Sequence, residues 1–323
     1  MIEALPLDVV ISVVDHDNEQ MTRRCLASLP AACDGVTWRV VLIENVLVAG
    51  IEGRLRRANP HIEIEIVVNA RPRGFGANHN RTLASITGGG GARYVLVLND
   101  DTVLAHGAVR ELVRHLDERR GDGAAAPVVL SPEGRACTGR FAYPTLRSAL
   151  RHDAGHQFGE LPAPDGWLQG CCLLLRTEAV REVGNFDERY FLFYEDADLS
   201  RRLADAGWGL SVCATARVTH FAHATVLRGA SAATTPRQGL RSRYLYLARH
   251  HGPRVATTSM IVGRALLVAR AAAAGGGIVG GPGRRRRAQD LLRLARYDPR
   301  RPVHDELEPH EAGRGVPSVR GPR

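Results

Sequence analysis

Strand-like and helix-like segments alternate through the first 120 residues of the chain. Short runs of Val, Leu and Ile are typical of buried strands, and apolar residues three or four positions apart are typical of helices. This alternation favours a mostly parallel sheet with helices on both faces, because parallel strands need a crossover between them. The expected strands are 9–14, 38–43, 62–68 and 94–98, and the expected helices are 19–29, 51–58, 74–86 and 107–119.

The second half of the chain is less regular. Residues 121–165 are rich in Gly, Pro and Arg and predict weak strands at most. After them, the pattern predicts strands at 167–176 and 209–220, a short helix that starts at Thr177, and a helix at 196–206.

Composition excludes several classes of protein. With 44% hydrophobic residues in 323, the chain can form a sizeable core and is not disordered throughout. Its six cysteines are too few for a disulfide scaffold, and without a CxxC pair they give no sign of structural zinc. All 43 basic residues are Arg, which indicates coding bias more than nucleic-acid binding. The net charge of +9 still favours anionic partners such as phosphates or an acidic membrane surface.

Polar turns follow all four strands expected in the first half. In parallel sheets, ligands bind beyond the carboxyl ends of the strands. We therefore expect the polar residues of these turns to share one rim of the sheet, namely 15–17, 44–45, 69–76 and 99–101.

Asp100 and Asp101 come directly after the fourth expected strand. Two carboxylates at a strand end can hold a divalent cation and, through it, a diphosphate, because hard cations prefer oxygen ligands. The alternative is a turn whose carboxylates are simply solvated. His220 ends the last expected strand and either completes a metal site with Asp101 or is a plain structural residue.

A second acidic group, Glu195, Asp196 and Asp198, lies at an expected helix N-terminus. Negative charge there can serve as a helix cap. However, the apolar residues 191–194 precede the group, and an apolar approach desolvates a carboxylate, which suits a general base. A basic, glycine-containing turn at 71–76 could meet phosphate, although it lacks the full dinucleotide-binding spacing.

Taken together, these motifs resemble the family 2 glycosyltransferases of the GT-A fold, and among them the rhamnosyltransferase-type members. The resemblance covers roughly residues 8–225, in the order of the family. It is carried by GFGANHN at 74–80, LNDDT at 98–102, GWLQG at 166–170, GNFDE at 184–188 and YFLFYEDADLSRR at 190–202.

The resemblance implies roles for individual residues. Asp101, with Asp100, would engage Mg²⁺ or Mn²⁺ on the diphosphate of a sugar nucleotide, and His220 would be a further metal ligand. Glu195 and Asp196 match the acidic pair that carries the catalytic base, with Asp196 favoured. The residues implied on the nucleotide-sugar side are Asp15, Glu44, Arg73, Gly74, Asn80 and Asp100. Those implied on the acceptor side are Trp167, Gln169 and Gly170.

The implied reaction is an inverting transfer from a dTDP- or UDP-sugar, with dTDP-rhamnose suggested by the subgroup. The acceptor hydroxyl would belong to a cell-surface glycan, a lipid-linked sugar or a natural product. The turns at 15–17 and 44–47 depart from the family pattern, which leaves the donor open. Two alternatives remain at this point, a non-catalytic nucleotide-sugar-binding protein and a sugar nucleotidyltransferase.

The expected domains are a GT-A catalytic domain at 1–230, a helical extension rich in Arg and Ala at 231–300, and a disordered tail at 301–323. Within the extension, an apolar helix near 255–274 precedes four consecutive arginines at 284–287. Such a helix either contacts an anionic membrane surface or packs on the catalytic domain. We expect a cytoplasmic monomer or homodimer, peripheral on the inner face of the membrane if the contact forms, with no nucleic-acid partner.

Overall fold

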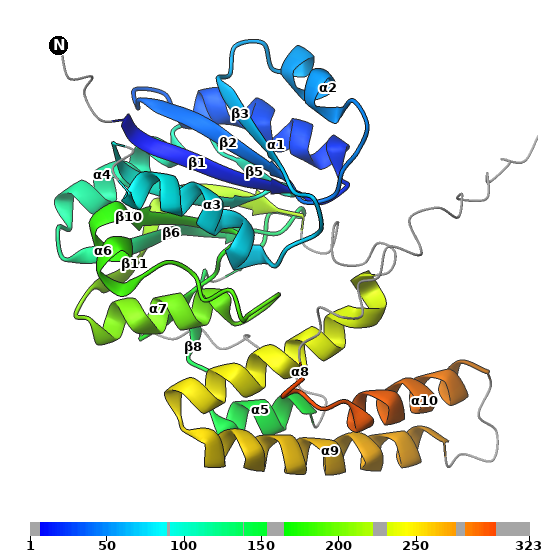
Figure 1. Cartoon of the computed structure of the whole chain (residues 1–323). Helices are drawn as coiled ribbons and strands as arrows, with labels where there is room; N and C mark the ends of the chain where they lie inside the picture. The colour runs from blue at the N-terminus through cyan, green and yellow to red at the C-terminus, as the bar shows by residue number, and fades with distance from the viewer. Residues whose placement is uncertain are drawn as a thin grey trace, which may run out of the picture.

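A nine-stranded, mostly parallel sheet forms the centre of the molecule in the computed structural model (Figure 1). The structure describes residues 7–88, 91–137, 139–153, 165–221, 231–275 and 282–301. In spatial order the strands are β3 (Ile64–Val68), β2 (Trp38–Glu44), β1 (Leu7–Asp15), β4 (Ala92–Asn99), β10 (Cys172–Arg176), β6 (Asp122–Leu130), β11 (Gly209–His220) and β5 (Thr102–Leu104), with β7 (Ala136–Cys137) paired to β6.

The expected parallel sheet is confirmed. β1 pairs in parallel with β2 and β4, β2 with β3, and β6 with β11. β10 lies between β4 and β6 and runs antiparallel to both. Because of this reversal, the start of β10 reaches the edge of the sheet at which β1, β2, β4 and β11 end. We call this edge, where the parallel strands end, the rim; in Figure 1 the arrowhead of β1 points toward it.

Helices cover both faces of the sheet, as the alternation predicts. On one face, aliphatic side chains of α1 (Glu19–Ala32), α2 (Ile51–Ala58) and α4 (Ala108–Glu118) bury against the strands. On the other face the same is true of α3 (Phe75–Thr87), α6 (Thr177–Val183) and α7 (Glu195–Asp205). This burial of apolar surface on both faces fixes the strands, and with them the rim.

Two expectations for the second half were wrong. Residues 122–130 form β6, a full strand inside the sheet, whereas weak strands at most were expected. The segment 167–176 is not one strand, since β9 (Gly166–Leu168) pairs with β8 (Arg140–Ala142) in a separate two-stranded sheet and β10 joins the large one. The break between β9 and β10 places Gly170 in a turn at the rim.

A helical layer lies below the sheet and α7 in Figure 1. It consists of α5 (Leu146–Asp153), α8 (Ser231–His250), α9 (Pro253–Gly275) and α10 (Pro282–Arg296). A third core cluster joins it to the sheet domain through Trp167, Tyr190, Ala197 and Tyr246. The helical extension is confirmed, although only α9 was expected as a helix.

The division of the chain at residue 230 stays a prediction, since α5 precedes that position and yet packs with α9. Of the expected disordered tail, residues 302–323 lie outside the described residues. Among the described residues, one helix, Pro253–Ala274, is long and apolar enough to cross a membrane by length and composition alone.

Candidate active site

Two buried carboxylates stand side by side at the ends of β1 and β2. Asp15 pairs with Glu44 in the parallel register, and both side chains are buried. Asp15 Oδ1 accepts a hydrogen bond from the hydroxyl of Thr22. Among the described residues, Asp15 Oδ2 and Glu44 Oε1 are buried without a hydrogen-bond partner. Burial raises the pKa of both groups, and the charge of Asp15 raises that of Glu44 further.

Three asparagines fix the loop that follows β3. Asn69 donates one hydrogen bond to Asn45 Oδ1 (2.9 Å) and another to Asn78 Oδ1 (2.6 Å). Asn45 in turn accepts from the backbone N–H of Arg73 (2.7 Å) and donates to the carbonyl of Arg73 (3.0 Å). A satisfied buried network of this kind rigidifies its surroundings, so the backbone of Arg73 is held in one position.

Arg73, Gly74 and Asn80 meet the loop that leads to α7. The guanidinium of Arg73 pairs with Glu188 at 2.9 Å. Asn80 both donates to the carbonyl of Phe186 (2.9 Å) and accepts from its N–H (3.0 Å). A Cβ on Gly74 would lie 2.6 Å from the carbonyl oxygen of Phe191, so only glycine fits there. These residues position the loop, while their expected contact with the nucleotide sugar stays a prediction.

Asp100 and Asp101 form the turn between β4 and β5, and both are buried. The pairing of β5 with β11 sets Thr102 opposite His220, so Asp101 Oδ1 comes within 3.1 Å of His220 Nε2. Burial opposes protonation of His220, but hydrogen bonds with Asp101 and Cys171 raise its pKa to about 10.

These side chains fit a divalent cation that is shared with a substrate. A carboxylate and an imidazole that has lost its proton are suitable ligands for Mn²⁺, and carboxylate oxygen for Mg²⁺. Among the described residues, no cluster of three or more His, Cys, Asp or Glu side chains is arranged to hold a metal alone. This matches the usual environment of Mg²⁺, which takes one or two carboxylates and completes its shell with water and substrate phosphates.

Glu195 and Asp196 begin α7. Asp196 accepts hydrogen bonds from the backbone N–H of Gly170 (3.0 Å, to Oδ2) and of Ala197 (2.8 Å, to Oδ1). Burial raises the pKa of Asp196 to about 6 despite these bonds, which favour the charged form. Burial, and then the charge of Asp196, raise the pKa of Glu195 well above its ordinary value. A carboxylate with a pKa near neutrality suits general base catalysis.

The backbone turns sharply just before this pair. Phe193 and Tyr194 have φ angles of 70° and 69°, in the left-handed region that residues other than glycine rarely adopt. We call Phe191–Tyr194 the hook. It is held by α8, where Ser242 donates to the carbonyl of Leu192 (2.8 Å) and the ring of Tyr246 lies 5.7 Å from that of Tyr194. Strained backbone that its surroundings hold in place is typical of functional sites.

Two consecutive residues connect the acidic pair to the metal-binding candidates. The N–H of Gly170 donates to Asp196, while the carbonyl of Cys171 accepts from the N–H of Asn99 (2.9 Å), two residues before Asp101. The thiol of Cys171 lies close enough to His220 to contribute to its raised pKa. The structure therefore brings Asp196, Asp101 and His220 together at the rim, around the turn at the start of β10.

The other acceptor-side candidates differ in their surroundings. The Trp167 indole is 9% exposed, packs 5.1 Å from the Phe141 ring and donates to the carbonyl of Ala142 (3.1 Å). Its side chain belongs to the third core cluster, which also holds Ala197, the residue after Asp196. Gln169 is partly exposed next to Gly170. A role in acceptor binding stays a prediction for all three residues.

Asp198 is a fully buried carboxylate one turn into α7, and it joins this helix to α8. Its Oδ2 lies 2.8 Å from Arg202 Nε, and its Oδ1 lies 2.8 Å from His250 Nε2 and 3.3 Å from Arg249 Nε. Burial would raise the pKa of Asp198, but hydrogen bonds from His250 and Arg202 lower it below its ordinary value. Asp198, Arg202, Arg249 and His250 are called the Asp198 cluster below.

The motifs single out part of this site and miss the rest. Asp198 and Arg202 lie inside the string at 190–202, so their importance is visible in the sequence. Arg249 and His250 carry no such signal, because they lie in an Arg-rich segment without a recognisable pattern. The proximity of Cys171 to His220 is equally invisible, since the two residues are distant in sequence and meet only through the sheet order.

With this geometry in place, comparison with known proteins settles the family. A family model described as "Glycosyltransferase like family 2" matches residues 6–244. The chain is a family 2 glycosyltransferase. The match covers well over half of the chain, from β1 into α8, and it confirms the resemblance carried by the motifs. Both alternatives, the non-catalytic binder and the nucleotidyltransferase, give way to a glycosyltransferase.

Curated relatives of this glycosyltransferase include rhamnosyltransferases. An N-acetylglucosaminyl-diphospho-decaprenol L-rhamnosyltransferase of Mycobacterium tuberculosis is 30% identical over 251 residues, which covers 71% of this chain and 80% of the relative. Rhamnosyltransferase WbbL of Escherichia coli K12 is 24% identical over 255 residues, covering 75% of this chain and 93% of the relative.

Solved structures confirm the GT-A fold. A mannosyltransferase from Pyrobaculum calidifontis, in complex with GDP-Man and Mn²⁺, superposes with a TM-score of 0.51 at 13% identity and covers 91% of this chain and 86% of its own. S. aureus TarS 1–349 in complex with UDP-GlcNAc gives a TM-score of 0.51 at 12% identity, covering 88% and 80%.

Proposed function

We propose that this glycosyltransferase moves a hexose from a nucleoside diphosphate donor to an acceptor hydroxyl with inversion at the anomeric carbon, and that Asp196 is the base. The observation that carries the proposal is the carboxylate of Asp196. It is fixed by the N–H groups of Gly170 and Ala197, and its pKa is about 6. Such a group is ionised at neutral pH and still basic enough to take a proton in the transition state.

The proposed step is a single displacement. As the acceptor oxygen forms its bond to the anomeric carbon, the bond from that carbon to the diphosphate breaks on the opposite face, and the acceptor proton passes to Asp196. The two backbone N–H groups keep the carboxylate in one orientation while it gains this proton. Glu195, buried behind it with a strongly raised pKa, adds little negative charge to the pair.

Asp101 and His220, with Asp100 beside them, are the residues proposed to hold Mg²⁺ or Mn²⁺ on the donor. When bound, the cation neutralises charge that develops on the diphosphate as it leaves. The Mn²⁺ in the related mannosyltransferase structure supports a divalent cation. The choice between the two ions is part of the proposal.

For the donor, we favour dTDP- or UDP-sugars, with dTDP-rhamnose first. Rhamnosyltransferases among the relatives support the sugar. The buried oxygens of Asp15 and Glu44 support the nucleotide, because two acceptors at the ends of β1 and β2 suit the N–H of a pyrimidine and a ribose hydroxyl. Arg73, Gly74 and Asn80 would complete this side. Trp167, Gln169 and Gly170 would lie toward the acceptor.

The proposed acceptor is a hydroxyl of a glycan, a lipid-linked sugar or a small natural product. One curated relative is named for a decaprenol-linked substrate, which favours the lipid-linked class. We propose a cytoplasmic enzyme, monomeric or homodimeric, that works at the inner face of the membrane.

A donor screen tests the proposal. Binding of dTDP-rhamnose, UDP-glucose, UDP-GlcNAc and GDP-mannose to the full chain would be measured by calorimetry with and without Mn²⁺. Product formed from the tightest donor would then be examined by NMR for its anomeric configuration. We expect a dTDP- or UDP-sugar to bind more tightly with Mn²⁺ and the product to be inverted. A retained configuration would overturn the mechanism, and preference for GDP-mannose would overturn the donor assignment.

A further inference from the structure

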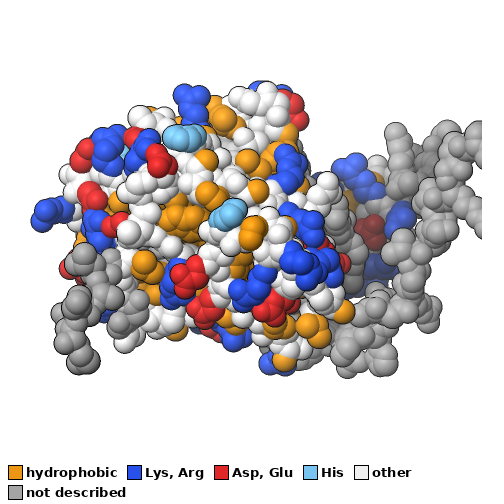
Figure 2. Space-filling view, turned by 90° about the horizontal axis from the view of Figure 1, so that it is seen from above, with side chains coloured by type: hydrophobic (Ala, Val, Ile, Leu, Met, Phe, Trp, Pro, Cys, Tyr) orange, Lys and Arg blue, Asp and Glu red, His pale blue; other side chains and the backbone are white. Residues whose placement is uncertain are grey.

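The positive charge of this protein is concentrated in one part of the fold. Residues 253–301 contain eleven arginines and two aspartates, so this segment alone accounts for the formal net charge of +9 of the whole chain. The remaining residues are close to neutral. Figure 2 shows the opposite side of the molecule, where basic and acidic side chains are interspersed. Charge that is gathered on one unit attracts an anionic partner to that unit.

The same unit exposes an apolar stripe. On α9, Ile261 is 59% exposed, Val268 48% and Val262 37%. Their neighbours on the same helical face, Ala265, Ala269, Ala272 and Ala273, are exposed as well. The stripe runs for about 18 Å along the helix at 1.5 Å per residue. Exposed apolar surface that continues over several turns indicates a binding surface.

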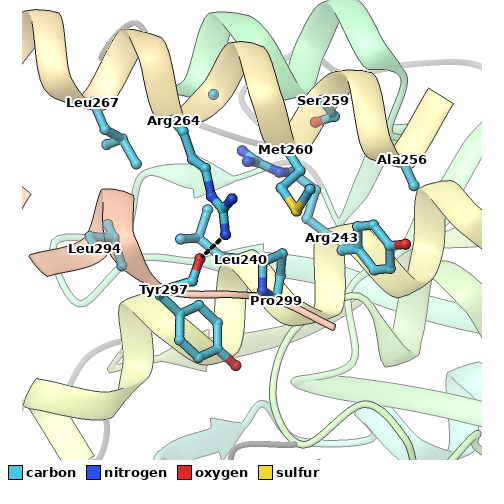
Figure 3. A pocket seen from close by; sticks show the side chains of 12 residues that line it. Leu240, Arg243, Ala256, Ser259, Met260, Arg264, Leu267, Leu294, Tyr297 and Pro299 are labelled. Carbon is cyan, nitrogen blue, oxygen red and sulfur yellow. Dashed lines mark hydrogen bonds between the residues drawn. The ribbon is translucent and has the colours of Figure 1, made fainter. Parts of the chain in front are cut away.

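The inner face of α9 is already occupied by protein. Met260, Arg264 and Leu267 point toward α8 and α10 in Figure 3, and the Arg264 guanidinium donates to the carbonyl of Tyr297 (2.8 Å). Ala256 and Ala271 are buried on this side. The packed face holds α9 in the helical layer, so the outward stripe is available for contact without any helix leaving the fold.

Arginines lie next to the stripe. α10 packs along α9, and it exposes Arg286, Arg287, Arg293 and Arg296 around the half-exposed Leu292. Arg254 is exposed on the same face of α9 as the stripe, two to three turns before it. Apolar side chains flanked by basic ones match the two regions of an anionic bilayer surface, which are the acyl boundary and the headgroup phosphates. A second copy of the chain is a poor match, because it would bring two such positive surfaces together.

We propose that α9 lies in the plane of an anionic membrane surface, with Ile261, Val262 and Val268 inserted at the acyl boundary and the arginines of α10 at the phosphates. The docking deepens the proposed function, on which it rests for the idea that a lipid-linked acceptor is met there. The docking itself needs neither donor nor acceptor, so it is tested separately from transfer.

The test is flotation of the full chain with vesicles of phosphatidylcholine alone and of phosphatidylcholine mixed with phosphatidylglycerol. Three variants are compared with the wild type. Ile261→Glu/Val268→Glu removes apolar contact, and Arg286→Glu/Arg287→Glu reverses charge on α10. Arg57→Glu/Arg120→Glu makes the same charge change at exposed sites on the sheet domain. Thermal unfolding of each variant checks that it folds, and size-exclusion chromatography gives its oligomeric state.

We expect the wild type to float with the mixed vesicles only, and the bound fraction to fall as salt is added. The variants on α9 and α10 should each bind at least about tenfold more weakly, while the Arg57/Arg120 variant should bind like the wild type. Wild type that stays in the soluble fraction with both vesicle types would overturn the inference. So would an equal loss in the Arg57/Arg120 variant, which would mean that net charge alone is responsible. A dimer that Ile261→Glu/Val268→Glu converts to monomer would reassign the stripe to a second copy.

Discussion

Asp196 combines a fixed position with a shifted pKa. Its two oxygens are bound by the N–H groups of Gly170 and Ala197, so the side chain cannot rotate freely. The raised pKa arises from burial, which the exposed Asp205 of the same helix lacks. Asp205, near the other end of α7, pairs with Arg201 in solvent and provides a matched comparison.

Asp196→Asn should reduce kcat for transfer by about 10²–10⁴-fold, because a positioned base contributes on that scale. Donor affinity, measured by calorimetry, should stay within a factor of about two to three of the wild type, since the amide keeps the shape of the side chain. Asp205→Asn serves as the control and should leave both quantities unchanged. Transfer at the wild-type rate in Asp196→Asn would remove this residue from the base role.

The pH dependence of transfer follows from the same group. Asp196 acts as a base only when it is ionised, so kcat/KM should rise with pH up to its pKa of about 6 and level off above it. Below that value, the rate should fall about tenfold per pH unit. The profile would be measured at saturating Mn²⁺ with stability checked at each pH. A rate that is flat from pH 4.5 to 7.5 would contradict the assignment.

At the scale of elements, α7 is set in place from two sides. The hook enters it with two left-handed residues, and the Asp198 cluster ties its second turn to the end of α8. The partners of the hook, Ser242 and Tyr246, and two partners of Asp198, Arg249 and His250, belong to α8. The proposed base is therefore positioned in part by the helical layer. An ordinary surface helix would carry no buried carboxylate with three cationic or donor neighbours.

Asp198→Asn should lower the free energy of unfolding by about 3 kcal/mol or more, because Arg202, Arg249 and His250 would keep their charges or donors without a buried counter-charge. Urea denaturation would measure the change. In Asp205→Asn, which breaks an exposed pair on the same helix, the free energy of unfolding should change by less than about 0.5 kcal/mol. Equal stability of the two variants would show that the cluster does not stabilise the helix.

A second close contact between elements lies at Gly74, where the start of α3 meets the hook. In Gly74→Ala the new Cβ would meet backbone atoms of Phe191 at 2.6 to 3.0 Å, so α3 and the hook must move apart. We expect a loss of about 1–3 kcal/mol in unfolding free energy, together with reduced kcat. Gly121→Ala is the control, because a Cβ at that glycine meets nothing within 4 Å. A fully active, fully stable Gly74→Ala would contradict the close approach.

Most elements of the sheet domain are visible in the sequence, and the exceptions have physical causes. α2 and β11 begin and end where the pattern predicts, since Ile and Leu mark one helical face and apolar residues at alternate positions mark the strand. β6 was missed because its first half is Gly and Ala. Small residues are needed there, since a Cβ on Gly123 would lie 2.9 Å from Trp208 and 3.0 Å from Ala179. The tight packing at this position leaves no room for the branched side chains by which strands are recognised in a sequence.

The site residues also fall into two groups, those that the sequence reveals and those that only the structure reveals. Asp101, Asp196 and His220 stand out because each begins, follows or ends a recognisable element. The Asp198 cluster and the proximity of Cys171 to His220 depend on contacts between segments more than 40 residues apart, which no local pattern encodes. Arg249 and His250 lie in α8, a helix that the sequence pattern does not predict, so their role could be seen only in the structure.

For the molecule as a whole, the third core cluster makes the helical layer part of the catalytic unit. Tyr246 and Leu247 of α8 are fully buried against Tyr190 and Ala197. Because the Asp198 cluster crosses the same boundary, the two parts should unfold together. Differential scanning calorimetry should therefore show one transition, with the calorimetric and van't Hoff enthalpies equal. Two resolved transitions would mean that the layer is an independent domain.

The reversed direction of β10 has a consequence for how enzymes of this kind can change their acceptor. The turn just before β10 supplies the N–H of Gly170, which donates to Asp196, and the carbonyl of Cys171, which accepts from Asn99. These two residues, called the hinge here, therefore contact both the proposed base and the proposed metal site. A substitution at the hinge that altered acceptor choice would disturb both of these sites. Relatives that serve new acceptors would instead be expected to diverge in the segments around it, with the hinge itself unchanged.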